Sequence, residues 1–188
     1  VWGVAVAIAL ALQRAWWPLA IWVLGTLVGN ALMHTMKYSI GIERPHLSAR
    51  VPEGFSFPSG HASMGMIFTG LITTLLWPAL TPKVRRVLLH GVALYVVAMT
   101  TSRLYLGAHW TSDLLAGWAL ASGMLALCWL MLRSGPATLS SSVNRARPGL
   151  VLLASLLAWS VMAATYIYPH FDQALWRYSP LLENSSSP

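Results

Sequence analysis

The chain has 188 residues, of which 56% are hydrophobic and only 9% are charged. An average globular domain carries about 25% charged residues, so this composition excludes an ordinary water-facing surface. The ten Trp and six Tyr residues suit the interface belts of membrane proteins. The net charge is +7, but the sequence has no long run of basic residues of the kind typical of nucleic-acid binding. The single cysteine, Cys128, excludes an internal disulfide. We therefore expect an all-α, polytopic membrane protein with no nucleic-acid partner.

Six apolar stretches predict about six membrane spans, at residues 1–12, 16–36, 62–80, 87–101, 114–132 and 149–167. Four of them are 19 to 21 residues long, which matches a hydrocarbon core of about 30 Å. The short fourth stretch is expected to extend through Arg86 or Leu106. The first stretch resembles the end of a helix that begins upstream.

The chain is expected to form a single membrane domain over residues 1–188 and to be a segment of a longer protein, with additional domains fused upstream or downstream. Residues 134–148, rich in Ser, Pro and Arg, predict a linker before the last span. Residues 181–188 predict a polar, Ser-rich tail.

The distribution of Lys and Arg predicts the orientation in the membrane, because basic residues accumulate in short cytoplasmic loops. Seven of the twelve fall on one side of the predicted bundle, and three of the other five lie in the motifs described next. Loops 37–60 and 102–112 are therefore expected on the extracytoplasmic face.

Two cations, Lys37 and Arg44, lie in the first of these loops. Their separation of seven residues is nearly two helical turns, so they would share one face if the helix continued past Met36. Two cations on one face favour a dianion. Snorkelling of both side chains to the membrane interface is the alternative interpretation.

A second group, Pro58-Ser59-Gly60-His61, directly precedes an apolar run. Ser59 is a good N-cap residue, and Gly60 would let the backbone approach a phosphate at the helix N-terminus. His61 would then be held at the phosphate, where it could protonate a leaving alkoxide. The alternative is a plain capped helix with an incidental interfacial histidine.

The third group combines Arg103, His109 and Asp113. His109 and Asp113 are four residues apart and are expected on one helical face, where the carboxylate would fix the imidazole tautomer and leave the other nitrogen as a nucleophile. Arg103 would present a planar, bidentate cation to phosphate oxygens. Trp110 and Tyr105 are interpreted as interface anchors.

Together these residues resemble the three signature motifs of the type 2 phosphatidic acid phosphatase (PAP2) superfamily, in the family's order. The matching residues are Lys37-x6-Arg44-Pro45, Pro58-Ser59-Gly60-His61 and Ser102-Arg103-x5-His109-x3-Asp113. The resemblance covers about residues 16–132. It departs at the ends, since bacterial membrane members usually have three spans before the first motif and this chain adds the run 149–167.

The resemblance implies a helical membrane fold with catalytic loops at the outer face and hydrolysis without a metal or other cofactor. It implies a phosphohistidine on His109, oriented by Asp113, with His61 as the acid for the leaving group. The phosphoryl group would be bound by Lys37, Arg44, Ser59, Gly60 and Arg103.

The expected substrate is a lipid phosphate in a bacterial inner membrane: undecaprenyl diphosphate, phosphatidylglycerol phosphate or phosphatidate. Two other functions stay open. A lipid phosphotransferase would use the same histidine, and a non-catalytic lipid-binding or transport module would keep only the fold. A vanadate-dependent haloperoxidase would share the motifs but belongs to soluble proteins, which the composition excludes.

Overall fold

The computed structural model describes residues 2–45, 54–134 and 148–162, and these parts are helical apart from short connections. The elements are α1 (Trp2–Leu12), α2 (Trp16–Ile40), α3 (Gly60–Leu76), the 3-10 turn η1 (Trp77–Ala79), α4 (Pro82–Tyr105), α5 (Thr111–Ser134) and α7 (Pro148–Met162). The prediction of an all-α fold is confirmed for this part of the chain.

Among the described residues, four segments are long and apolar enough to cross a membrane: Trp16–Ile40, Gly60–Ala79, Pro82–Tyr105 and Thr111–Ser134. The expectation of six spans is not confirmed, because α1 has only 11 residues and α7 has 15 within the described range, fewer than the roughly 20 that a span needs. The short fourth stretch extends at both ends, as expected. Most of the predicted linker, the end of the sixth stretch and the polar tail lie outside the described residues.

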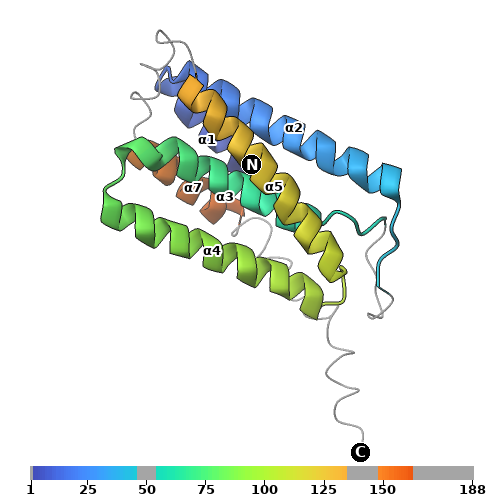
Figure 1. Ribbon diagram of the computed structural model, residues 1–188. Helices are drawn as coiled ribbons and strands as arrows, with labels where there is room; N and C mark the ends of the chain where they lie inside the picture. The colour runs from blue at the N-terminus through green and yellow to red at the C-terminus, as the bar shows by residue number, and fades with distance from the viewer. Residues whose placement is uncertain (1, 46–53, 135–147, 163–188) are drawn as a thin grey trace, which may run out of the picture.

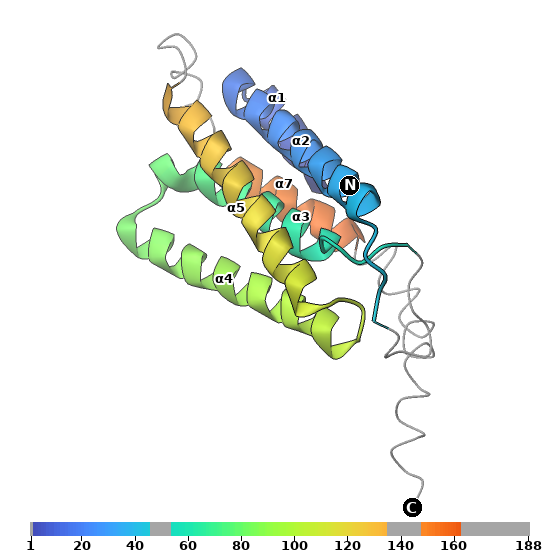
Figure 2. The same cartoon turned by 45° about the vertical axis from the view of Figure 1, so that its right-hand side comes forward.

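Helix α3 lies at the centre of the bundle. It packs against α2, α4 and α5, most extensively against α5, while α1 packs against α2 and α7. Figures 1 and 2 show α3 between α4 and the other helices. The C-terminal ends of α2 and α4 and the N-terminal ends of α3 and α5 meet at one end of the bundle, at the right of Figure 1. The central helix therefore begins where the two predicted loops meet.

The interior of the bundle is apolar, and so is much of its outside. Trp22 of α2 packs on Phe68 of α3, and its Nε1 donates to the carbonyl of Gly3 at 3.0 Å, which holds α1 in place. On α4, Val87 and Leu94 are 73% and 70% exposed. Large apolar side chains in water would be costly along a whole helix, whereas lipid tails accept them. The outer surface thus supports the assignment to a membrane.

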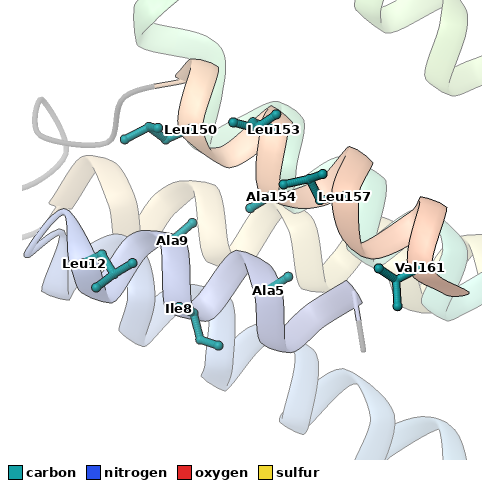
Figure 3. Close-up of a pocket in the computed structure, with 9 residues that line it drawn as sticks. All are labelled: Ala5, Ile8, Ala9, Leu12, Leu150, Leu153, Ala154, Leu157 and Val161. Atoms are coloured by element: carbon teal, nitrogen blue, oxygen red, sulfur yellow. The ribbon is translucent and has the colours of Figure 1, made fainter.

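A cavity of about 450 Å³ lies between α1 and α7 and is lined by apolar side chains of both helices, including Ile8, Leu12, Leu153 and Leu157 (Figure 3). None of its lining residues carries an ionisable group. It contributes nothing to chemistry on a phosphate.

The contact between α3 and α5 is closest at Gly117. A Cβ built there would lie 2.9 Å from the Cβ of Ala62 and 3.0 Å from the carbonyl oxygen of Ser59. The latter is a backbone atom that cannot rotate away. The first turn of α3 is therefore seated directly on the backbone of α5.

Gly117→Ala is expected to lower the free energy of unfolding by about 1–3 kcal/mol, because overpacking at this contact forces α3 and α5 apart. Thermal unfolding in detergent would measure it. Gly123→Ala on the same helix is the matched control, since a Cβ at Gly123 meets no atom within 4 Å. Equal unfolding midpoints for the two variants would contradict the close approach at Gly117.

Candidate active site

His109 and Asp113 form the buried pair that the sequence predicts. His109 Nδ1 lies 3.3 Å from Asp113 Oδ2, and the exposed fractions of the two residues are 6% and 0%. Asp113 Oδ2 also accepts a hydrogen bond from the backbone N–H of Trp110 at 2.9 Å. Because a carboxylate only accepts, the proton of a neutral His109 is held on Nδ1 and its Nε2 keeps a lone pair.

The pair does not lie on one helical face, so the expected geometry is wrong in that respect. Helix α5 begins at Thr111, and His109 precedes it. Asp113 is the third residue of α5. Its carboxylate accepts from the N–H of Trp110, the residue just before the helix, as the acid of a capping box does. The same carboxylate oxygen therefore caps the helix and orients the imidazole.

Arg44 lies on the other side of His109. Its Nη1 is 3.3 Å from His109 Nε2 and donates to the carbonyl of Ala108 at 2.9 Å, and its Nε donates to the carbonyl of Gly54 at 3.1 Å. Burial and the charge of Arg44 lower the pKa of His109 to about 4, against the opposing effect of Asp113. Burial also lowers the pKa of Arg44. At neutral pH His109 is therefore an uncharged imidazole.

Replacing Arg44 with Gln is expected to raise the pKa of His109 from about 4 toward its ordinary value near 6.5, because the nearest positive charge is removed. NMR titration of ¹⁵N-labelled histidine would follow the change. Lys83→Gln, at the start of α4, removes a charge at the opposite end of the bundle and should leave the titration unchanged. An unshifted pKa in the Arg44 variant would exclude this electrostatic coupling.

The expectation that Lys37 and Arg44 share a helical face is wrong. Helix α2 ends at Ile40, and Gly41 adopts a left-handed conformation with φ of 68° while its N–H bonds to the carbonyl of Lys37. A glycine in this conformation ends a helix without steric cost. Arg44 therefore lies in the following loop, and the loop, not the helix, brings it to His109.

Lys37 is half-buried, and its Nζ contacts three main-chain carbonyls. The acceptors are Phe55 at 2.8 Å, Pro58 at 3.1 Å and Ser56 at 3.4 Å. These residues lead directly into α3. Lys37 thus fixes the path of the chain that carries Ser59 and His61.

Ser59 is the N-cap of α3, as predicted: its side chain accepts from the N–H of Ala62 at 3.4 Å. Its own N–H donates to the carbonyl of Asp113 at 3.0 Å, so the second and third motifs are joined through the main chain. At Gly60 a Cβ would make only ordinary contacts, 3.6 Å from Met33 Cε. Crowding by protein atoms therefore does not by itself require this glycine.

His61 and Arg103 reach the same region from α3 and α4. Partial burial and the charges of Arg103 and Arg44 lower the pKa of the His61 ring, while the side chain stays accessible to solvent. Arg103 Nε is buried and has no hydrogen-bond partner in the part of the chain that the structure describes. Such a donor is costly to bury unpaired and is suited to an anion.

Sequence reasoning missed a contact that joins the two loops and others that close the first loop on itself. Trp110, expected only as an interface anchor, donates from Nε1 to the carbonyl of Glu43 at 3.0 Å. The Ser56 hydroxyl donates to the carbonyls of Ile42 and Glu43, both at 3.1 Å. The buried Ser56 and the exposed Trp110 carry no motif signal, because their partners are main-chain oxygens.

Of the other histidines, His34 stacks on Tyr38, with ring centroids 6.2 Å apart, and Tyr38 meets Phe55 edge-on at 6.1 Å. Through Tyr38 and Phe55, the His34 ring is thus linked to the segment that leads into α3. His90 is exposed at the opposite half of α4, and its Nδ1 contacts the carbonyl of Arg86. His46 and His170 lie outside the described residues.

Comparison with known proteins agrees with these motifs. The family model of the PAP2 superfamily matches residues 15–135, more than half of the chain. The chain is 32% identical over 121 residues to an undecaprenyl-diphosphatase of Sulfolobus acidocaldarius, which covers 61% of this chain and 55% of that protein. It is 36% identical over 95 residues to phosphatidylglycerophosphatase B of Escherichia coli, covering 49% of this chain and 35% of that protein.

No solved structure matches the chain significantly. The match to the family model spans all three motifs, from Lys37 to Asp113, and the helices that position them. The chain belongs to the PAP2 superfamily.

Proposed function

We propose that this chain is a membrane lipid phosphatase that hydrolyses a phosphomonoester or diphosphate through a phosphohistidine on His109. The observation that carries the proposal is the buried His109–Asp113 pair, whose second nitrogen, Nε2, faces the guanidinium of Arg44. A neutral imidazole with a fixed tautomer is a nucleophile. Cations beside it would stabilise the charge that develops on phosphoryl oxygens.

In the first step, Nε2 of His109 attacks phosphorus, and an N–P bond forms as the bond to the leaving oxygen breaks. His61, protonated once the negatively charged phosphate lies beside it, gives its proton to that oxygen, which leaves as a lipid alcohol or a lipid monophosphate. Arg44 and Arg103 donate to the phosphoryl oxygens, while Lys37 and the Ser59–Gly60 turn hold the loop that faces them. The Nδ1 proton stays on His109, where Asp113 stabilises the positive charge.

In the second step, water attacks the phosphohistidine. The neutral His61 takes a proton from the water, the N–P bond breaks, and inorganic phosphate leaves. His109 returns to the neutral form with its proton on Nδ1. The cycle needs no metal ion in this proposal, because three cationic side chains perform the electrostatic role that metal ions have in other phosphoryl transfers.

A lipid substrate is supported by the position of the site and by the relatives. The site lies at the ends of four helices long enough to span a membrane, which supports a position near the lipid headgroups. The relatives' names specify a diphosphatase and a phosphatidylglycerophosphatase. Undecaprenyl diphosphate, phosphatidylglycerol phosphate and phosphatidate are therefore the proposed candidates. The proposed setting is a bacterial inner membrane, with the site on the extracytoplasmic face.

The test is release of inorganic phosphate by the purified chain in detergent against these three lipids, with and without EDTA. We expect release from at least one lipid and no loss with EDTA. Loss of activity that a divalent metal restores would contradict the metal-free mechanism. Phosphate transfer to an added lipid alcohol without release would favour the phosphotransferase, and no turnover by the folded chain would contradict the proposal.

A further inference from the structure

A cavity with charged lining residues lies at the end of the bundle opposite the candidate active site. It has a volume of about 400 Å³ and is formed by the end of α3, the turn η1, the start of α4 and the last turns of α5. Arg85, one of its lining residues, lies eighteen residues before Arg103 on α4, which is about 27 Å along the helix axis. This cavity is therefore separate from the candidate active site, near the opposite membrane face.

Two arginines line the cavity, and each lies over a tryptophan. The Arg85 guanidinium is 5.0 Å from the ring centroid of Trp77, and its Nε donates to the Trp77 carbonyl at 3.0 Å. The Arg133 guanidinium is 4.6 Å from the ring centroid of Trp129. Stacking restricts the motion of a guanidinium and leaves its outer N–H groups available to an anion.

Carboxylates do not neutralise these charges in the described parts of the chain. The acidic residues in residues 2–45, 54–134 and 148–162 are Glu43 and Asp113, both at the candidate active site. Lys83 and Arg86, in the first turns of α4, add further positive charge at this end. The potential here therefore favours an anion.

We propose that this basic–aromatic cavity binds the headgroup phosphate of an anionic phospholipid. Arg85 and Arg133 would donate to the phosphate, and the acyl chains would lie along the apolar side chains of α3 and α5, such as Leu75 and Leu132, which line the same cavity. A cavity that has both cationic and apolar lining residues, at the end of membrane-spanning helices, suits a lipid better than a free phosphate ion. Its volume lies within the roughly 300–1,000 Å³ typical of ligand sites.

The test uses the whole purified chain in phosphatidylcholine nanodiscs with increasing phosphatidylglycerol, and native mass spectrometry to count bound lipids. Phosphatidylglycerol is a diester and has no terminal phosphate to hydrolyse. Arg85→Gln combined with Arg133→Gln is expected to weaken its binding at least about tenfold. The matched control, Lys83→Gln with Arg86→Gln, removes the same charge outside the lining and should change binding less than about twofold.

Arg133→Lys keeps the charge but loses the stacked, bidentate geometry, and we expect an intermediate loss of binding. Unfolding midpoints without phosphatidylglycerol verify that every variant is folded. Equal losses in the two double variants would overturn the proposal, because they would indicate diffuse attraction. Binding of phosphatidylcholine with equal affinity, or displacement of the lipid by millimolar inorganic phosphate, would also overturn it. Phosphate release by the double variants is measured separately and is expected to be unchanged.

Discussion

His109→Ala is expected to reduce the turnover number for phosphate release by about 10⁴-fold or more, because it removes the only atom proposed to form a bond to phosphorus. Substrate binding should change much less, since the cations that hold the phosphate remain. The measurement is steady-state release from the best lipid substrate, together with acid quenching of the reaction on ³²P-labelled substrate to detect the phosphoenzyme. Labelled protein should be absent in the variant.

His90→Ala is the matched control for this change. His90 is an exposed histidine in the N-terminal half of α4, away from the candidate active site. The substitution makes the same chemical change as His109→Ala, an imidazole to a methyl group. We expect wild-type turnover and wild-type labelling from it. Near-normal phosphate release by the His109 variant would show that another group attacks phosphorus.

Asp113→Asn is expected to lower turnover by about 10³–10⁴-fold in a protein that still folds. The carboxylate that accepts from His109 Nδ1 would become an amide, whose NH₂ group favours the tautomer with the proton on Nε2. That tautomer has no lone pair directed at phosphorus. Because Asp113 Oδ2 accepts from both His109 Nδ1 and the N–H of Trp110, an NH₂ group at that position also gives up the bond to Trp110, and we expect a loss of stability of about 1 kcal/mol beside the loss of turnover.

The tautomer of His109, measured by NMR, distinguishes a loss of imidazole orientation from a loss of folding. The ¹⁵N shifts of His109 should report a proton on Nδ1 in the wild type and on Nε2 in the Asn variant, and a cooperative unfolding transition should show that the Asn variant is folded. Glu43→Gln is the control for replacing an acid by an amide, because the exposed Glu43 contributes its main-chain carbonyl to Trp110. A wild-type turnover for Asp113→Asn would contradict the orienting role.

The contact between His109 and Asp113 could be predicted from the sequence because their separation fits more than one local geometry. Four residues bring His109 to Asp113 on a helix, and they also do so across the start of one, which is what α5 provides. The pairing was predictable, and the capping role of Asp113 was not. Helix boundaries depend on local caps that hydrophobic periodicity does not reveal.

The first motif shows the opposite case. The apolar run gives no reason for α2 to end before Arg44, but Gly41 does, since glycine just past a helix end is a stop signal. Reading that signal would have placed Arg44 in a loop. Its contact with His109 also needs the carbonyls of Gly54 and Ala108, and every residue has a carbonyl. Contacts of this kind follow only from the tertiary fold.

The number of spans was the least predictable part of the fold. Hydropathy detects apolar length, and within the described residues the first stretch forms an 11-residue helix packed on α2 and α7. Three of the four central stretches were predicted at about the length of a span, and the fourth, 87–101, reaches that length only because α4 extends at both ends.

The hydrogen bond from the Ser59 N–H to the Asp113 carbonyl has a consequence for how sequences of this kind can vary. Most side-chain substitutions leave a main-chain bond in place, so the register between the two halves of the site tolerates exchange of many neighbouring residues. A one-residue insertion within α3 or α5 is different, because it rotates everything beyond it by about 100°. Length changes are therefore expected to collect in the connections away from this junction, such as the turn between α3 and α4.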